Sequence, residues 1–167
     1  MKKNKEYLDR LRKLMAERDI DGCIISGTDP HQSELPPRHW RCREWLTGFE
    51  SENGTNGTAV VTADEALCWT DSRYFIQAEA QLEGTGFKMM KEDGPDAVDL
   101  IDWVAEHTNE GDKVGIDGMT FSVSYAQRLQ QELNDNGVTL DTDFPVFDYI
   151  YPDRPERPQN SSSTMRK

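Results

Sequence analysis

The sequence of 167 residues is poor in the residue types that build metal centres and disulfides. It has three cysteines, in no CxxC pair, and three histidines, in no HxxxH or HExxH pattern. Because an odd number of scattered cysteines does not make a disulfide framework, we expect a reducing, cytoplasmic setting. His39 and Cys42 have ligand-like spacing, but no second pair accompanies them. The simpler reading of His39 is a core or solvated side chain.

Basic residues and long apolar runs are also scarce. The chain has 19 Lys and Arg against 31 Asp and Glu, a formal net charge of −12. Such an acidic surface repels phosphate backbones and anionic lipids, so we expect no nucleic-acid and no membrane partner. No apolar run has the ~20 residues that a membrane-spanning helix needs. The basic start of the chain has no apolar stretch behind it, so we expect no secretory signal.

The apolar residues follow helical spacing in some segments and form short strand-like runs in others, which predicts an α/β fold. A tight acidic turn joins residues 58–62 to residues 66–70, so we expect these two strands to form a hairpin within a mixed β-sheet flanked by helices. The expected helices are residues 7–15, 72–82, 96–107 and 122–136, and the expected strands are residues 23–26, 58–62, 66–70, 87–90, 113–117 and 138–140.

The composition changes after Tyr151. Three prolines, at positions 152, 155 and 158, are followed by a run of serines. Such a segment has little to bury. We therefore expect one domain over residues 1–151 and a Pro/Ser-rich linker or tail over residues 152–167.

The neighbours Asp29, His31 and Ser33 have the composition of a nucleophilic triad. A triad needs its three groups to converge in space, and neighbours in one turn seldom do so. The simpler prediction is that Asp29 caps a short helix, with Pro30 at its first position and Gln32 completing a capping box. No glycine-rich phosphate loop is present, and we expect no acidic cluster at successive strand ends.

Arg73 is the main candidate for a functional residue. It lies in the segment Trp69–Phe75, which is the end of a buried strand that continues into a helix. A helix N-terminus carries partial positive charge, so an arginine there calls for an anionic partner. That partner is either an aspartate of the fold, such as Asp71 or Asp117, or the carboxylate of a ligand, which suits the planar guanidinium. The residues alone leave both readings open.

Several motifs stand in the order seen in Xaa-Pro aminopeptidases. They are the HQSE block at residues 31–34 after Asp29, Gly48-Phe49, GTAVVT at 57–62, WTDSRYFIQA at 69–78, VGID at 114–117 and DRPERP at 153–158. The chain resembles the N-terminal, creatinase/prolidase-type domain of the aminopeptidase P branch over residues 5–158. Three departures from the family pattern are a loop about three residues longer at residues 50–56, Leu35 in place of Tyr, and Tyr151 in place of Trp.

The resemblance implies a ribonuclease-H-like domain that precedes a separate catalytic domain. The family releases the N-terminal residue before proline with two divalent metal ions, commonly manganese, held by that other domain. No catalytic or metal-binding residue therefore carries over to this chain, which we expect to be inactive alone, whereas the resemblance implies that its parent protein is an aminopeptidase. The arginine of the WTDxRYF motif implies that Arg73 binds substrate.

The resemblance also implies partners: the protein's own catalytic domain, proline-containing peptides and a second copy of the chain in a homodimer. Two rival hypotheses remain. One is a free-standing protein-interaction module that has lost its catalytic half. The other is a small metal-dependent hydrolase or nuclease, against which the acidic charge argues.

Overall fold

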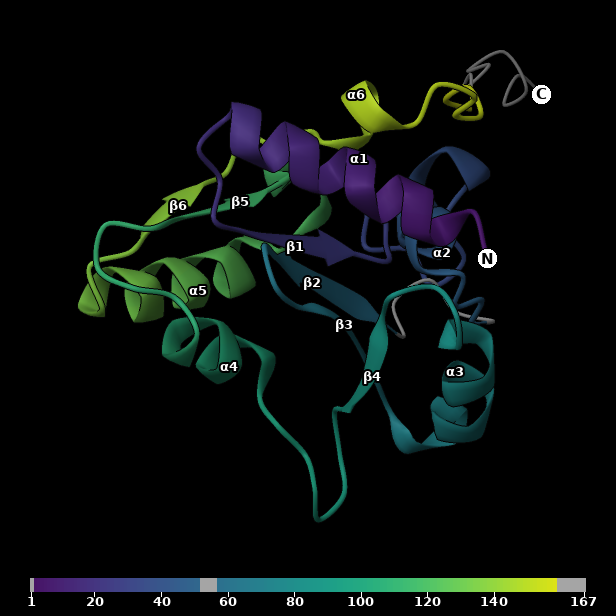
Figure 1. Cartoon of the computed structure of the whole chain (residues 1–167), viewed down its shortest axis with the longest axis horizontal. Helices are drawn as coiled ribbons and strands as arrows, with labels where there is room; N and C mark the ends of the chain where they lie inside the picture. The colour runs from purple at the N-terminus through teal and green to yellow at the C-terminus, as the bar shows by residue number, and fades with distance from the viewer. Residues whose placement is uncertain (1, 52–56, 159–167) are drawn as a thin grey trace, which may run out of the picture.

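The structure, a computed structural model, describes residues 2–51 and 57–158. These residues form a sheet of six strands in the order β4-β3-β2-β1-β5-β6, with helices on both faces (Figure 1). The strands are β1 (Gly22–Ser26), β2 (Thr58–Thr62), β3 (Ala66–Thr70), β4 (Lys88–Lys91), β5 (Lys113–Ile116) and β6 (Thr139–Asp141).

The direction of the strands brings most of their carboxyl ends to one edge of the sheet. β2 is antiparallel to both of its neighbours, β1 and β3, whereas the other neighbouring pairs are parallel. Five of the six strands described therefore run the same way. The predicted α/β class, the mixed sheet and the hairpin of β2 and β3 are confirmed.

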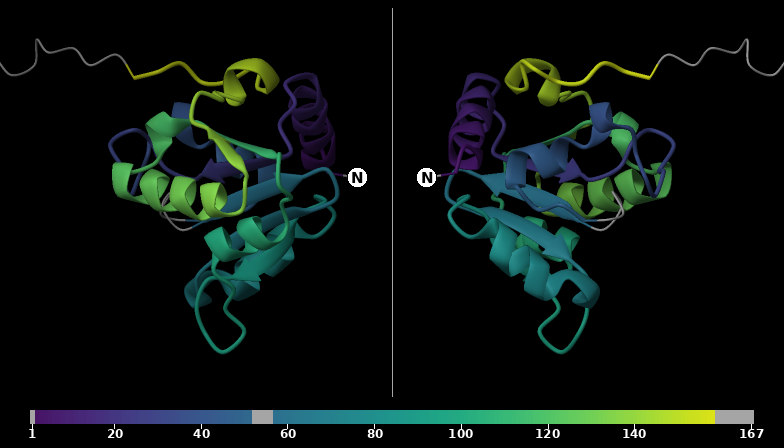
Figure 2. Two further views of the ribbon diagram at one scale, coloured as in Figure 1. Left: turned by 90° about the vertical axis from the view of Figure 1, so that its left-hand side faces the viewer. Right: turned by 90° about the vertical axis from the view of Figure 1, so that its right-hand side faces the viewer.

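Two apolar cores lie on the two faces of the sheet. α1 (Asn4–Glu17), α2 (Cys42–Thr47), α3 (Phe75–Leu82) and α6 (Phe147–Ile150) cover one face. α4 (Leu100–Glu106) and α5 (Val123–Asp135) cover the other, as the two views of Figure 2 show. Successive side chains of β1 alternate between the cores, because Cys23 and Ile25 face α1 whereas Ile24 faces α4 and α5.

The prediction of a short helix after Asp29 is wrong. Gln32 has φ +56°, which is outside the helical region, and the segment forms a turn instead. The carboxylate of Asp29 accepts hydrogen bonds from the amides of His31 and Ser33, so it caps this turn and not a helix.

The third predicted helix, at residues 96–107, is shorter than expected. It begins at Leu100 because the carboxylate of Asp99 accepts from the amide of Asp102 and so caps α4 there. Val98 therefore precedes the helix and is exposed, whereas Trp103 within the helix is buried. The short helices α2 and α6 were not predicted, because each is less than two turns long.

The expectation that nothing after Tyr151 is buried is wrong for Arg154, whose side chain is only 11% exposed. The described residues 152–158 follow the surface of the domain near α2 and α6. The boundary at residue 151 stays a prediction, and residues 159–167 of the expected tail lie outside the described residues. The same holds for residues 52–56 of the longer loop. Within the described parts of the chain, none of the helices combines the length and apolarity needed to cross a membrane.

Candidate functional site

Aspartates follow several of the strands at the shared edge of the sheet. Asp29 follows β1, Asp71 follows β3 and Asp117 follows β5. Each carboxylate accepts backbone amides of its own turn. Aspartates therefore stand at several strand ends, and the reason for their presence is local: each aspartate closes the turn that leaves the sheet.

These aspartates do not converge into a metal site. Within residues 2–51 and 57–158, no three side chains of His, Cys, Asp or Glu are grouped so that they could hold a metal ion. His39 and Cys42, which have ligand-like spacing, make structural contacts: the Cys42 thiol donates to the His39 carbonyl at 3.3 Å. The His39 ring in turn contacts the carbonyl of Pro155 through Nδ1 at 2.7 Å.

The Asp29 turn does not form a triad. Its carboxylate accepts hydrogen bonds from the backbone amides of His31 and Ser33, at 3.1 and 2.9 Å, and so is engaged by the backbone of its own turn. Burial by itself would raise the pKa of Asp29, but the hydrogen bonds from Ser33 and His31 outweigh it and lower the pKa. The ionised carboxylate is thus fixed in a structural role.

Arg73 lies in a 3₁₀ turn, Ser72–Tyr74, between β3 and α3. Its Nε donates to Asp71 Oδ1 at 3.0 Å and its Nη2 donates to Asp71 Oδ2 at 2.9 Å, which makes a two-pronged ion pair. Hydrogen bonding by Arg73 lowers the pKa of Asp71. The Arg73 side chain remains 63% exposed. Of the two aspartates that the sequence left open, Asp71 is the partner.

Asp117 is too far along the sheet to pair with Arg73. β2 and β1 lie between β3 and β5, which puts the two strands about 14 Å apart at ~4.8 Å per strand. Burial raises the pKa of Asp117, and the one amide hydrogen bond that its carboxylate accepts, from Met119, offsets only part of this effect.

Residues that the sequence analysis missed hold the Arg73 turn in place. The backbone amide and hydroxyl of Ser72 donate to the two oxygens of Asp93, at 3.0 and 3.2 Å. Asp93 comes shortly after β4, so the signal in the sequence was an acidic residue following a strand next to β3. The turn is thereby tied to two neighbouring strand ends.

α3, the helix that follows the Arg73 turn, also holds the start of the longer loop. Gln77 donates to the carbonyl of Glu50, and Gln81 accepts from the amide of Glu50 at 2.8 Å. From the other side, the buried Arg43 donates to the carbonyl of Phe49 and to the hydroxyl of Ser51, both at 3.0 Å. The segment that enters residues 52–56 is therefore fixed relative to α3 and Arg73.

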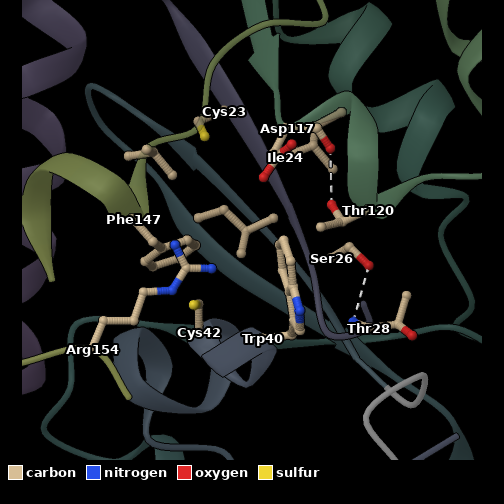
Figure 3. Close-up of a pocket in the computed structure, with 12 residues that line it drawn as sticks. Cys23, Ile24, Ser26, Thr28, Trp40, Cys42, Asp117, Thr120, Phe147 and Arg154 are labelled. Carbon is tan, nitrogen blue, oxygen red and sulfur yellow. Dashed lines mark hydrogen bonds between the residues drawn. The ribbon is translucent and has the colours of Figure 1, made fainter. Parts of the chain in front are cut away.

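A small cavity lies near the ends of β1 and β5. Figure 3 shows Asp117 and Thr120 on one side of it and Arg154 beside Cys42 and Phe147 on another. Its volume is about 20 Å³, which is room for about one water molecule. Burial raises the pKa of Cys42 to about 12, so this thiol is not a nucleophile at neutral pH. The cavity is therefore not a substrate pocket.

The Creatinase/Prolidase N-terminal domain family matches residues 8–144 of this chain. Aminopeptidase P2 of Arabidopsis thaliana is 39% identical over 128 residues, and a probable Xaa-Pro aminopeptidase P of Leptosphaeria maculans is 34% identical over 154 residues. The two matches cover 75% and 92% of this chain but 18% and 24% of the relatives. The chain thus spans about a fifth to a quarter of these proteins' length.

Solved structures show the same similarity. The crystal structure of X-prolyl aminopeptidase from Caenorhabditis elegans, described as a cytosolic enzyme with a di-nuclear active site, superposes with a TM-score of 0.82 at 29% identity, over 92% of this chain and 26% of that one. An Xaa-Pro aminopeptidase structure from Streptococcus pyogenes gives 0.58 at 28% identity, over 83% of this chain and 89% of that one. The resemblance seen in the motifs is confirmed.

Proposed function

Because the chain belongs to the Creatinase/Prolidase N-terminal domain family, we propose that it is the non-catalytic N-terminal domain of an Xaa-Pro aminopeptidase. In this role it shapes access of proline-containing peptides to a catalytic domain and contacts the peptide through Arg73. The observation that supports this most directly is the state of Arg73: its guanidinium is held in one orientation by Asp71 while most of the side chain faces solvent.

This arrangement suits recognition of a peptide carbonyl or carboxylate. A guanidinium offers several N–H donors in one plane, and a charged donor strengthens each hydrogen bond. Because Asp71 already restricts the rotation of the side chain, less conformational entropy is lost when a peptide binds. The net charge of the pair is close to zero, so the contact depends on hydrogen-bond geometry more than on long-range attraction.

Among the described residues no ligand cluster is found. We propose that a following catalytic domain holds two divalent ions, with manganese as our expectation, and that these ions supply an activated nucleophile and polarise the scissile carbonyl when bound. We further propose a cytoplasmic homodimer, in line with the cytosolic relative from C. elegans.

The test is Arg73→Ala in the chain joined to its catalytic domain. We expect kcat/KM for an Xaa-Pro peptide to fall by about 10- to 100-fold, as for loss of a charged hydrogen bond, with unchanged metal content and thermal midpoint. Arg128→Ala is the matched control, because Arg128 is also exposed and paired with an aspartate, Asp99, at 3.2 Å. Equal kinetics of the Arg73 and Arg128 variants would refute the role of Arg73.

The isolated chain provides a second test of the same proposal. Supplied with manganese, it should release no residue from Xaa-Pro peptides and bind no stoichiometric metal. Turnover by the purified chain would place the catalytic centre within it and overturn the proposal.

A protein-interaction module without a catalytic half is the second candidate. The observation that favours it is Ile76, which is 89% exposed one turn after Arg73 and gives this surface an apolar contact point. If Ile76→Asp abolished self-association of the isolated chain while Arg73→Ala left peptide turnover of the joined protein unchanged, this second candidate would be preferred.

A further inference from the structure

We name the last described segment of the chain, residues 151–158, the strap. It contains no helix or strand, so the backbone ladders of regular structure do not hold it. Side chains hold it instead. One partner, Asp148, lies in the neighbouring α6, and the others lie in or next to the 3₁₀ turn Arg38–Trp40 and α2, more than a hundred residues earlier in the chain.

Arg154 is the central contact of the strap. Its Nη1 donates to Asp148 Oδ1 at 2.7 Å, and its Nε donates to the carbonyl of His39 at 2.8 Å. The guanidinium also lies 5.2 Å from the centre of the Trp40 ring. One side chain thus joins the strap to α6 and to the 3₁₀ turn through two hydrogen bonds and a cation–π contact.

The backbone of the strap is fixed by His39. The His39 Nδ1 lies 2.7 Å from the Pro155 carbonyl, and because a carbonyl only accepts, Nδ1 carries the proton. The other ring nitrogen, Nε2, is buried without a partner. The neutral ring fits this site, because a charged ring would bring a second buried N–H without an acceptor.

Aromatic rings hold both ends of the strap. Tyr151 stacks on Trp45 with ring centres 4.1 Å apart, and Trp45 stacks on Tyr7 of α1 at 3.9 Å. Further along, the guanidinium of Arg157 lies 5.3 Å from the centre of the Trp40 ring. The contacts therefore continue from Tyr151 to Arg157 and are not confined to one point.

The composition of the strap lowers the entropy lost when it is ordered. Prolines at positions 152, 155 and 158 restrict the backbone before any contact forms. The feature that made the segment look like a free linker in the sequence therefore makes it easier to immobilise.

We propose that the strap is a rigid exit from the domain, locked by Arg154, which fixes the place and direction in which the chain reaches Pro158. In the longer protein of the proposed function, on which this consequence rests, the strap holds the following domain in one orientation. Arg154 is then a positioning residue for that domain and has no contact with substrate.

Backbone ¹⁵N relaxation of the isolated chain tests the proposal without any catalytic assay, so its failure is separate from failure of the Arg73 role. In the native chain we expect order parameters of about 0.8 at the amides of Arg154, Glu156 and Arg157, and below about 0.6 in Arg154→Ala. Arg154→Lys should also loosen the strap, because an ammonium lacks the planar fork that spans Asp148 and the His39 carbonyl.

Cleavage at the Glu156–Arg157 bond by a glutamate-specific protease gives a second readout. Arg154→Ala should raise the rate of this cut about tenfold or more, whereas Arg128→Ala should leave it unchanged. Asp148→Asn, which keeps the Arg154 side chain, should give a smaller rise and guards against a variant that fails to fold. Order parameters below about 0.6 in the native chain, or equal cleavage in native chain and Asp148 and Arg154 variants, would overturn the proposal.

Discussion

Arg43 and Arg73 are the same residue type in opposite surroundings. Arg43 is fully buried in α2, and among the described residues no carboxylate lies within ion-pair distance of it. Its hydrogen bonds go to a backbone carbonyl and a hydroxyl, and its Nε has no partner. Arg73 is largely exposed and has a two-pronged pair with Asp71.

The difference separates a buried arginine that the fold needs from an arginine in an exposed ion pair. A buried guanidinium has lost its hydration, so the groups around it are arranged to satisfy it and cannot change without cost. An exposed ion pair exchanges its partners with water and contributes little to folding. Arg43 is thus needed for the structure of the loop that begins at Phe49, whereas the exposed position of Arg73 is compatible with the binding role that we propose for it.

Replacing Arg43 should produce the largest effect. Arg43→Met would leave the Phe49 carbonyl without its donor in a buried site, and we expect a loss of about 3 kcal/mol in the free energy of unfolding. Arg73→Ala should leave that free energy close to the native value. Urea unfolding of the isolated chain measures both, and equal losses for the two variants would contradict the comparison.

Filling the space next to Arg43 should destabilise the chain by a smaller amount than replacing Arg43. A Cβ atom on Gly57 would lie 2.9 Å from Arg43 Nη1, so we expect Gly57→Ala to destabilise the chain by about 1–3 kcal/mol. Gly22→Ala is the control, because the nearest atom to its Cβ would be 3.5 Å away, at ordinary contact distance. A Gly57 variant as stable as the Gly22 variant would show that Arg43 can move aside.

The contribution of the Asp71–Arg73 ion pair to stability should depend on pH. The folded pKa of Asp71 is lowered, chiefly by its hydrogen bonds with Arg73, so its contribution to stability is present above the unfolded pKa, near 3.9, and is lost as pH falls through the folded pKa. Asp71→Asn keeps an oxygen for the turn but has no such charge. The stability difference between native chain and variant should therefore shrink below about pH 4. A difference that stays constant from pH 6 to pH 2 would argue against the pair.

Arg154 is intermediate between Arg43 and Arg73 in the exposure of its side chain. Its neighbour His39 should give the smallest effect on the free energy of unfolding. Burial lowers the folded pKa of His39, with Arg154 and Arg157 lowering it further and Asp148 and the Pro155 carbonyl opposing them. The unfolded ring therefore binds a proton more readily, and stability should fall as pH drops below about 6.5. In His39→Asn, the amide can still donate to the Pro155 carbonyl but does not titrate. The stability of this variant should therefore change less with pH in this range. Identical profiles would show that His39 does not contribute.

The candidate site was only partly predictable. Arg73 could be named as a candidate, and Asp71 and Asp117 could be named as its possible partners, but the choice between the two aspartates could not be made. It depends on the order of the strands, which puts β2 and β1 between β3 and β5. Arg43 gave no signal, because a charged residue in a short amphipathic segment normally faces solvent.

Local patterns were sufficient for the strands, the hairpin and the helices α1, α3 and α5, because side-chain periodicity and turn residues act over a few neighbouring positions. They were misleading after Asp29, where the left-handed backbone of Gln32 accompanies a hydrogen bond from its side chain to the carbonyl of Thr120, 88 residues away. The contacts of the strap could likewise not be predicted from the sequence, since Arg154 and His39 are 115 residues apart. Contacts between distant segments depend on how the sheet brings them together, and only the folded chain contains that information.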